Sequence, residues 1–241
     1  MTNKRDIDLK SKQTSPVERA SAGSEIAAFL KDAKATTNVA RAGRLVIALD
    51  ATMSRQPTWD RACSLQGEMF AAAGKFGHLT MQLVYFRGFG ECAASRWVQD
   101  GDTLARLMTR IDCRGGQTQI RKVLRHAIDE TKRKKVQALV YIGDCVEEDV
   151  DGLCARAGEL GLLGVPAFVF QDGRDGHAET AFREIARLTG GAHFRLDESA
   201  PGELAALLKA AAVFATGGRP ELEKLTKGGD VGARRLLAHL R

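Results

Sequence analysis

From Arg44 onward, short apolar runs alternate with longer segments whose apolar residues recur at helical spacing. Short runs rich in Val, Ile and Leu are typical of strands buried on both faces of a sheet. We expect strands at residues 44–49, 78–86, 136–142, 165–170 and 192–196, and helices at about 59–74, 101–111, 118–132, 149–161, 177–189 and 201–214. This alternation predicts an α/β fold with a doubly wound, mostly parallel central sheet and helices on both faces.

One further run, at residues 90–98, departs from this alternation. It is more polar than the others, and only a short turn at Arg87-Gly88 separates it from the preceding strand. So short a connection suits a hairpin, whereas parallel strands need a long crossover. We therefore expect one antiparallel strand at the edge of the sheet.

The segment before the α/β domain divides into two parts. Residues 1–14 are polar and are expected to be disordered. Ser15-Pro16-Val17-Glu18 then has the form of a helix capping box with proline at the first helical position. Apolar residues follow at helical spacing to about residue 35. We therefore assign residues 15–41 to an N-terminal helix and linker.

The α/β domain itself is expected over residues 42–216, a boundary set by a break in the pattern at Gly217-Gly218-Arg219-Pro220. Residues 217–241 are expected to form a C-terminal tail. A short helix at about 231–240 within this tail would dock its leucines.

The composition limits the class of protein. The 241 residues are enough for one well-buried domain with appended segments, and 44% hydrophobic with 27% charged residues is ordinary for a globular protein. No apolar run is long enough to cross a bilayer, and no apolar secretory core follows the polar first residues, so we expect a cytoplasmic protein with no membrane partner. Five scattered cysteines without a CxxC pair predict neither a zinc site nor a disulfide framework.

The net charge of +6 is spread along the chain. Its densest basic cluster, Lys132-Arg133-Lys134-Lys135, falls where a helix should end, and basic residues there complement the helix dipole. No aromatic residues interleave with the cluster, and no nucleic-acid-binding motif occurs. We expect no nucleic-acid partner.

The loop Asp50-Ala51-Thr52-Met53-Ser54 follows the first apolar run directly and places three oxygen-bearing side chains at alternate positions. Loops at the carboxyl ends of strands are where open α/β sheets bind ligands. A carboxylate and two hydroxyls suit hard cations such as Mg²⁺, Mn²⁺ or Ca²⁺ better than zinc or copper. Taken alone, the loop is also compatible with a nucleophile or a helix cap.

Two later segments strengthen the metal interpretation. Gly115-Gly116-Gln117-Thr118 opens a helix, and the Thr118 hydroxyl could cap that helix or face a ligand. The apolar run at 140–142 ends in Gly143-Asp144, whose carboxylate could cap the next helix. Because all three loops lie at one edge of a parallel sheet, their oxygens can converge. The candidate metal ligands are Asp50, Thr52, Ser54, Thr118 and Asp144.

This order of motifs resembles the von Willebrand factor A (VWA) domain with its metal-ion-dependent adhesion site. The family pattern is DxSxS, then threonine, then aspartate, and the five positions occur here in that order across residues 42–215. Thr52 in place of serine is the one departure, and it keeps the hydroxyl.

The resemblance implies a role for each residue. Thr52 and Ser54 would bind Mg²⁺ or Mn²⁺ directly, Thr118 would do so in the ligand-engaged state, and Asp50 and Asp144 would act mainly through waters. An Asp or Glu of a partner protein would complete the coordination, with no chemical step. Bacterial members often serve as adaptors for other machinery, including AAA+ ATPases, so the resemblance implies a protein partner of that kind.

Two alternatives remain open. Asp50 closing a strand, with Asp144 and Asp149 later, also resembles haloacid-dehalogenase-like phosphatases, in which Asp50 would be the nucleophile and Mg²⁺ a cofactor. Against this, Thr52 occupies the position of the second carboxylate that such enzymes use. The other alternative is a domain that binds partners without metal.

Two features beside Asp144 have simpler interpretations. Cys145 is expected to be a packing or loop thiol, although a helix N-terminus could lower its pKa. The acidic run Glu147, Glu148, Asp149 and Asp151 is expected to favour the first turn of the helix that follows it.

Overall fold

The computed structural model describes residues 43–55, 79–196 and 201–240. These residues belong to one compact unit, Ala40–Arg241. The expectations for residues 1–14, for the N-terminal helix within 15–41 and for the helix at 59–74 lie outside the described residues. Within the described ranges, no helix is both long enough and apolar enough to cross a bilayer.

A six-stranded sheet in the order β3-β2-β1-β4-β5-β6 forms the centre of the domain. Every pairing is parallel except that of β2 with β3, which lies at one edge. This confirms the predicted mostly parallel α/β fold and its antiparallel edge strand. The strands are β1 (Gly43–Asp50), β2 (Leu79–Arg87), β3 (Glu91–Ala94), β4 (Ala138–Gly143), β5 (Ala167–Gln171) and β6 (Ala192–Arg195).

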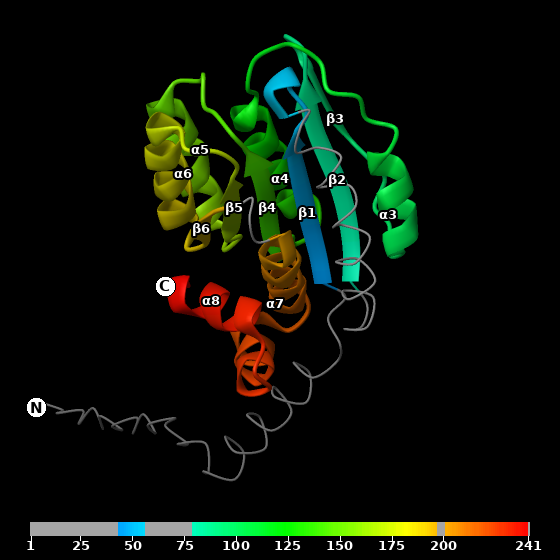
Figure 1. Ribbon diagram of the computed structural model, residues 1–241, viewed down its shortest axis with the longest axis vertical. Coiled ribbons are helices and arrows are strands. Elements are labelled where there is room, and N and C mark those ends of the chain that lie inside the picture. The colour runs from blue at the N-terminus through cyan, green and yellow to red at the C-terminus, as the bar shows by residue number, and fades with distance from the viewer. Residues whose placement is uncertain (1–42, 56–78, 197–200, 241) are drawn as a thin grey trace, which may run out of the picture. The chain divides into compact units, whose positions relative to one another are not determined.

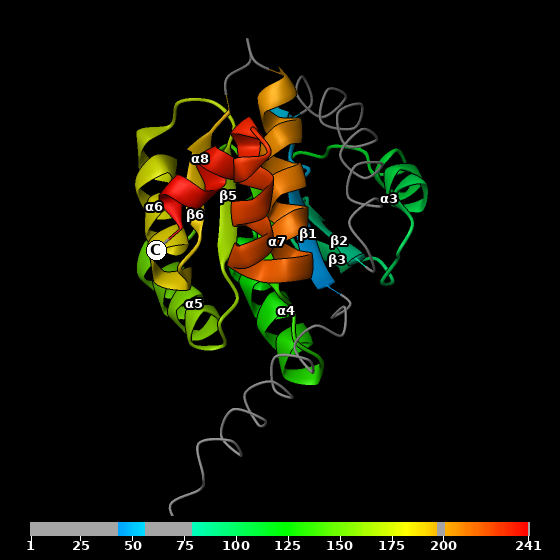
Figure 2. The same cartoon turned by 90° about the horizontal axis from the view of Figure 1, so that it is seen from below.

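Helices cover both faces of the sheet (Figure 1), as predicted. The helical elements are η1 (Met53–Arg55), α3 (Gly101–Met108), α4 (Ile120–Arg133), α5 (Val150–Leu162), α6 (Gly176–Thr189), α7 (Pro201–Lys227) and α8 (Val231–His239). Helices α4, α5 and α6 share one apolar core with the sheet, and α3, α7 and α8 share the other. Figure 2 shows α7 and α8 side by side.

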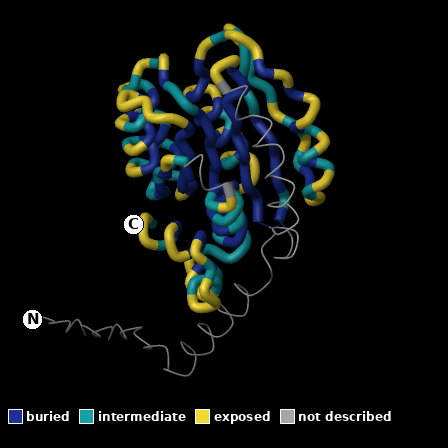
Figure 3. Tube along the Cα trace, in the orientation of Figure 1, coloured by how far each residue is buried: buried dark blue, intermediate teal, exposed yellow. Residues whose placement is uncertain are grey.

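The alternation of side chains along β1 explains the two cores. All eight residues of β1 are buried. Leu45, Ile47 and Leu49 point into the core with α3 and α7, whereas Val46 and Ala48 point into the core with α4, α5 and α6. The buried strands run through the middle of the molecule while exposed backbone lies on the outer helices and loops (Figure 3). Burial on both faces favours an apolar run, which the sequence has from Leu45 to Leu49 between Arg44 and Asp50.

The C-terminal segment packs onto the same domain. Gly218 interrupts α7 with φ 65° and ψ −160°, a backbone conformation that glycine adopts without strain. The chain then continues as helix to Lys227, and α8 follows at the place where a short helix was expected. Leu222 and Leu236 are buried in the core that also contains Leu45. Residues beyond 217 therefore contribute to the hydrophobic core.

A buried ion pair fixes the start of β1. The Arg44 guanidinium lies 2.9 Å from the Glu130 carboxylate, with side chains 8% and 10% exposed. The same carboxylate accepts a 2.9 Å hydrogen bond from Trp97 Nε1, and Arg44 lies 3.7 Å above the Trp97 ring. These contacts join β1 to the last turns of α4 at the end of the strand opposite Asp50.

The connectivity reverses direction beside β1. The chain passes from β1 to β2 on one side, and later returns through α4 to β4 on the other side. In open α/β sheets, ligands bind outside the carboxyl ends of the strands at this switch point. Asp50 ends β1, and Asp144 directly follows β4. The fold therefore brings these two predicted site residues to the position that favours ligand binding.

Candidate metal site at the carboxyl ends of β1 and β4

The three predicted side chains of the first loop lie together. Asp50 has no exposed surface, and its Oδ1 accepts a 2.8 Å hydrogen bond from the backbone N–H of Thr52. The Thr52 and Ser54 hydroxyls are 3.1 Å apart, within hydrogen-bond distance. Thr52 is buried and Ser54 is exposed, so the oxygens extend from the end of the strand to the surface.

The segment before α4, which contains Gly115 and Gly116, contacts both the Asp50–Ser54 loop and the β2–β3 turn. The backbone N–H of Arg114 donates to the carbonyl of Ala51 at 3.0 Å. Gly116 packs so closely on Gly88 that a Cβ at this position would lie 2.1 Å from the Gly88 carbonyl oxygen. Only glycine fits this approach, which holds the segment before α4 against the β2–β3 turn.

Thr118 does not cap α4. The N-cap residue is Gln119, and its side chain makes no capping hydrogen bond. Instead the Thr118 hydroxyl accepts a 3.0 Å hydrogen bond from the backbone N–H of Glu147. The Glu147 carboxylate accepts a 2.9 Å bond from the Thr118 backbone N–H in return. Thr118 is thus fixed against the loop that follows Asp144.

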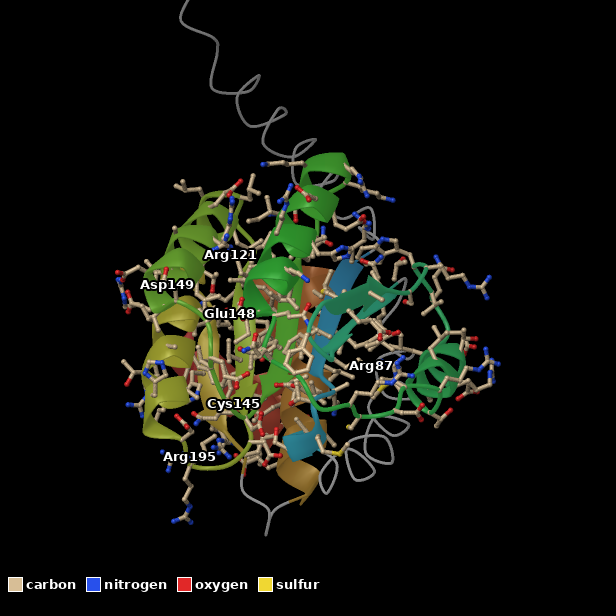
Figure 4. The ribbon with its side chains drawn as sticks, turned by 90° about the horizontal axis from the view of Figure 1, so that it is seen from above. Arg87, Arg121, Cys145, Glu148, Asp149 and Arg195 are labelled. Carbon is tan, nitrogen blue, oxygen red and sulfur yellow. The ribbon has the colours of Figure 1, made fainter. Side chains whose placement is uncertain are left out.

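The acidic run after Asp144 divides between two helices. As expected, Asp149 caps α5 through the Gly152 N–H at 2.8 Å, and Asp151 lies in the first turn of α5. The expectation was wrong for Glu147 and Glu148, which reach the N-terminus of α4. Glu148 accepts hydrogen bonds from the backbone N–H groups of Ile120 and Arg121. Figure 4 shows Glu148 between Cys145 and Arg121.

Burial raises the pKa of Glu148. Loss of solvation raises the pKa of this carboxyl, and the hydrogen bonds from Arg121, Ile120 and Thr118 offset that rise only in part. The first four N–H groups of a helix have no acceptor within it. Glu148 accepts two of them, those of Ile120 and Arg121, from a loop far along the chain. No local capping pattern signals this contact, so it could not be read from sequence.

Asp144 and Cys145 lie beside Asp50. A carboxylate oxygen of each aspartate and the Cys145 Sγ all lie within 4.8 Å of one another. The pKa of Cys145 is raised, first by burial and then by the charge of Asp144 and a hydrogen bond to it. The lowering that a helix N-terminus could cause does not occur.

A buried tyrosine hydroxyl underlies this cluster. Tyr141 is 3% exposed, and its ring stacks on Phe86 and meets Phe182 edge to face. A Cβ on Gly143 would lie 2.3 Å from the Tyr141 hydroxyl oxygen, so the missing side chain makes room for it. The pKa of Tyr141 is raised by burial and then by the charges of Asp50, Cys145 and Asp144. Sequence reasoning treated Tyr141 only as a strand residue.

The residues present fit a cation. Two carboxylates close together in a buried place repel each other unless a positive charge or a proton separates them. Asp144 Oδ1 and the Tyr141 hydroxyl are both buried, and neither has a hydrogen-bond partner among the residues that the structure describes. Buried polar atoms without partners are rare and point to a missing ion or water. The arrangement can therefore hold a divalent cation with oxygen ligands.

Solved structures that are similar to this chain include VWA domains. A von Willebrand factor type A protein from Catenulispora acidiphila aligns with a TM-score of 0.59 and 16% identity, over 73% of this chain and 43% of that chain. The SpRpn10 VWA domain aligns with a TM-score of 0.56 and 12% identity, over 68% of this chain and 94% of that chain. An aerotolerance-related membrane protein from Bacteroides fragilis NCTC 9343 aligns with a TM-score of 0.53 and 19% identity, over 70% and 94%.

These likenesses establish the fold, which is the α/β fold of VWA domains, as the sequence motifs predicted. The alignment covers less than half of the C. acidiphila chain. Neither a protein-family model nor a curated protein matches this chain.

Proposed function

We propose that this chain, which has the fold of VWA domains, binds a partner protein through a divalent cation at the carboxyl ends of β1 and β4. The observation that carries the proposal is the approach of Asp50 and Asp144, from two different strands, to within 4.8 Å at the switch point of the sheet. Two carboxylates so close together, one of them fully buried, favour a bound cation. Mg²⁺ or Mn²⁺ suits the carboxylate and hydroxyl oxygens around them.

Five side chains would hold the cation: Asp50, Thr52, Ser54, Thr118 and Asp144. Thr52 and Ser54 would offer neutral hydroxyl oxygens from one loop. Asp50 fixes that loop by accepting the Thr52 N–H, and Asp144 would supply charge from the end of β4. Because most of the direct ligands would be neutral, a bound Mg²⁺ or Mn²⁺ would keep an open position that attracts a further carboxylate.

The partner would be a protein that offers an Asp or Glu side chain to this position. Ser54 and Met53 are exposed beside the buried Thr52, so a partner can reach the edge of the site. Solved structures with this fold include a pilus adhesin, SpaC from Lactobacillus rhamnosus GG, and the human COPII-coat protein Sec24c. For this chain we propose an adaptor role in the bacterial cytoplasm, with an AAA+ ATPase as a partner.

The proposed function needs no catalytic step. Thr52 stands where a haloacid-dehalogenase-like phosphatase would carry its second carboxylate, and its N–H donates to Asp50. Asp50 has no exposed surface, whereas a nucleophile must reach its substrate. Both features favour Asp50 as an anchor of the loop over Asp50 as a nucleophile.

Affinity capture tests the proposal. Tagged full-length protein is incubated with lysate of its source in Mg²⁺, and bound proteins are compared with and without EDTA. We expect a partner that is lost with EDTA and with Asp144→Ala, and retained with Asp129→Ala, an exposed aspartate on α4. A partner retained in all four conditions would contradict the proposal. Hydrolysis of an aryl phosphate that disappears in Asp50→Asn would favour the phosphatase instead.

A further inference from the structure

Cys145 lies beside the proposed Mg²⁺ or Mn²⁺ site but is not one of its five ligands. Its Sγ lies within 4.8 Å of a carboxylate oxygen of both Asp50 and Asp144. Asp50 comes from the end of β1, whereas Asp144 and Cys145 follow β4, so two separate elements bring the three groups together. A single ion placed among them would contact one sulfur and two oxygens.

The distances suit a small thiophilic cation. Zinc binds sulfur at about 2.3 Å and carboxylate oxygen at about 2.0–2.2 Å, so in its tetrahedral geometry the ligand atoms lie about 3.6 Å apart. The three atoms lie within 4.8 Å of one another without an ion, so a bound ion would draw them closer together. Thiolate ligands favour Zn²⁺ and Co²⁺ over Mg²⁺, which prefers oxygen throughout.

The Tyr141 hydroxyl is a second, independent observation. It is buried, it has no hydrogen-bond partner in the described part of the chain, and it lies against Gly143, the residue before Asp144. Carboxylates that bind metals are themselves hydrogen-bonded by neighbouring groups, which orient them. A tyrosine hydroxyl in this position can donate to a ligand oxygen or to a metal-bound water.

We propose that Cys145, Asp50 and Asp144 together form a three-ligand site for a thiophilic divalent cation, with Zn²⁺ as the best fit. Zinc sites with three protein ligands keep a fourth position open. A partner carboxylate would take that position, so this inference rests on the proposed function and specifies its metal. It departs from the sequence-based expectation that the cysteines form no zinc site. When the thiol coordinates, its proton passes to solvent, as it does for thiolate ligands in general.

The two modes of metal binding use different side chains and can be separated. Binding of Mg²⁺ would depend on the hydroxyls of Thr52, Ser54 and Thr118. Binding of Zn²⁺ or Co²⁺ would depend on Cys145. Asp144 would contribute to both. Loss of one mode of binding can therefore be told apart from loss of the other by the variants that cause it.

Cobalt absorption provides the direct test. Reduced full-length protein is titrated with Co²⁺, and thiolate-to-cobalt charge transfer is followed in the near ultraviolet. We expect a band that saturates at one equivalent, disappears on addition of Zn²⁺, and is lost in Cys145→Ser. Cys154→Ser, which changes a free cysteine on α5, should keep the band. Affinity for Zn²⁺ should fall at least about tenfold in Cys145→Ser, whereas Mg²⁺ binding should change little.

A second measurement needs no variant. Alkylation of Cys145 is followed by mass spectrometry in the wild-type protein with Zn²⁺, with Mg²⁺ and with neither. We expect alkylation of Cys145 to be slower with Zn²⁺ than without metal, and faster with Mg²⁺ than with Zn²⁺. Equal alkylation under all conditions, or a cobalt band unchanged in Cys145→Ser, would overturn the inference. Loss of Mg²⁺ binding in Thr118→Ala would still support the proposed function in that case.

Discussion

The backbone N–H of Thr118 donates to the Glu147 carboxylate at 2.9 Å, and the N–H of Glu147 donates back to the Thr118 hydroxyl at 3.0 Å. The Thr118 side chain also hydrogen-bonds Glu148. A hydroxyl has one proton and two lone pairs, so these contacts leave one lone pair for a further partner. These hydrogen bonds hold the segment before α4 against the loop that follows Asp144.

Removal of the Glu148 carboxylate should weaken the contact between the start of α4 and the loop after Asp144. In Glu148→Ala, the N–H groups of Ile120 and Arg121 lose their acceptor, a change comparable to loss of a helix cap. We expect a loss of about 1 kcal/mol in the free energy of unfolding, measured by urea denaturation. Glu223→Ala, at an exposed position on α7, serves as control and should change stability by less than about 0.5 kcal/mol. Equal stability of both variants would contradict the role of Glu148.

Gly143 should tolerate no side chain while Tyr141 keeps its hydroxyl. A Cβ at Gly143 would overlap the Tyr141 hydroxyl oxygen at 2.3 Å. We expect Gly143→Ala to lower the free energy of unfolding by about 1–3 kcal/mol, as overpacked cores do. Gly158→Ala is the control, because nothing lies near that position in α5.

A double-mutant cycle checks the cause. Tyr141→Phe removes the hydroxyl oxygen and should restore part of the stability lost in Gly143→Ala. Strictly additive effects would contradict a direct overlap. Tyr141→Phe alone should not lower the stability of the metal-free protein, because the hydroxyl has no partner among the described residues.

The buried ion pair at the start of β1 should make stability depend on pH. Burial raises the pKa of Glu130, but hydrogen bonds from Trp97, Arg44 and Arg133 outweigh it and lower the pKa below the ordinary value of 4.5. A lowered pKa in the folded state adds stability that is present above the unfolded pKa and is lost as pH falls through the folded pKa. Glu130→Gln should therefore cost about 3 kcal/mol at pH 7.

Urea denaturation between pH 7 and pH 3 measures this effect. The difference in free energy of unfolding between wild type and Glu130→Gln should shrink as pH falls below about 4.5. Asp129→Asn, at the neighbouring exposed position, should show no such convergence. A difference that stays constant with pH would contradict the assignment.

Much of the fold followed from the sequence because the strands are buried on both faces. In β1 the run from Leu45 to Leu49 is apolar throughout, so the aspartate that follows it, Asp50, marks the carboxyl edge. The same reasoning located Asp144 after β4. The hairpin and the order of helices followed from short connections and helical spacing.

The rest of the site depends on contacts between residues far apart in the chain. Glu147 and Glu148 reach α4 across nearly thirty positions, and local patterns favoured α5 instead. The place of the Tyr141 hydroxyl depends on the absence of a side chain at Gly143 and on rings from β2 and α6. Packing of this kind has no periodicity that a sequence displays.

Metal binding should stabilise the protein. A ligand that binds only the folded state at one hundred times its dissociation constant adds about 2.7 kcal/mol. Thermal unfolding in saturating Mn²⁺ should therefore begin at a higher temperature than unfolding in EDTA. The shift should be smaller in Asp144→Ala than in the wild type. Unfolding at the same temperature with and without Mn²⁺ would contradict the presence of a site.

Isothermal titration of Mg²⁺ and Mn²⁺ into wild type, Thr118→Ala and Asp144→Ala measures directly whether the predicted side chains bind a cation. Thr109→Ala, an exposed threonine after α3, is the matched control. We expect one bound cation in wild type and in Thr109→Ala, with clearly weaker binding in Thr118→Ala and Asp144→Ala. Identical binding by all four proteins, or no binding by the wild type, would contradict it.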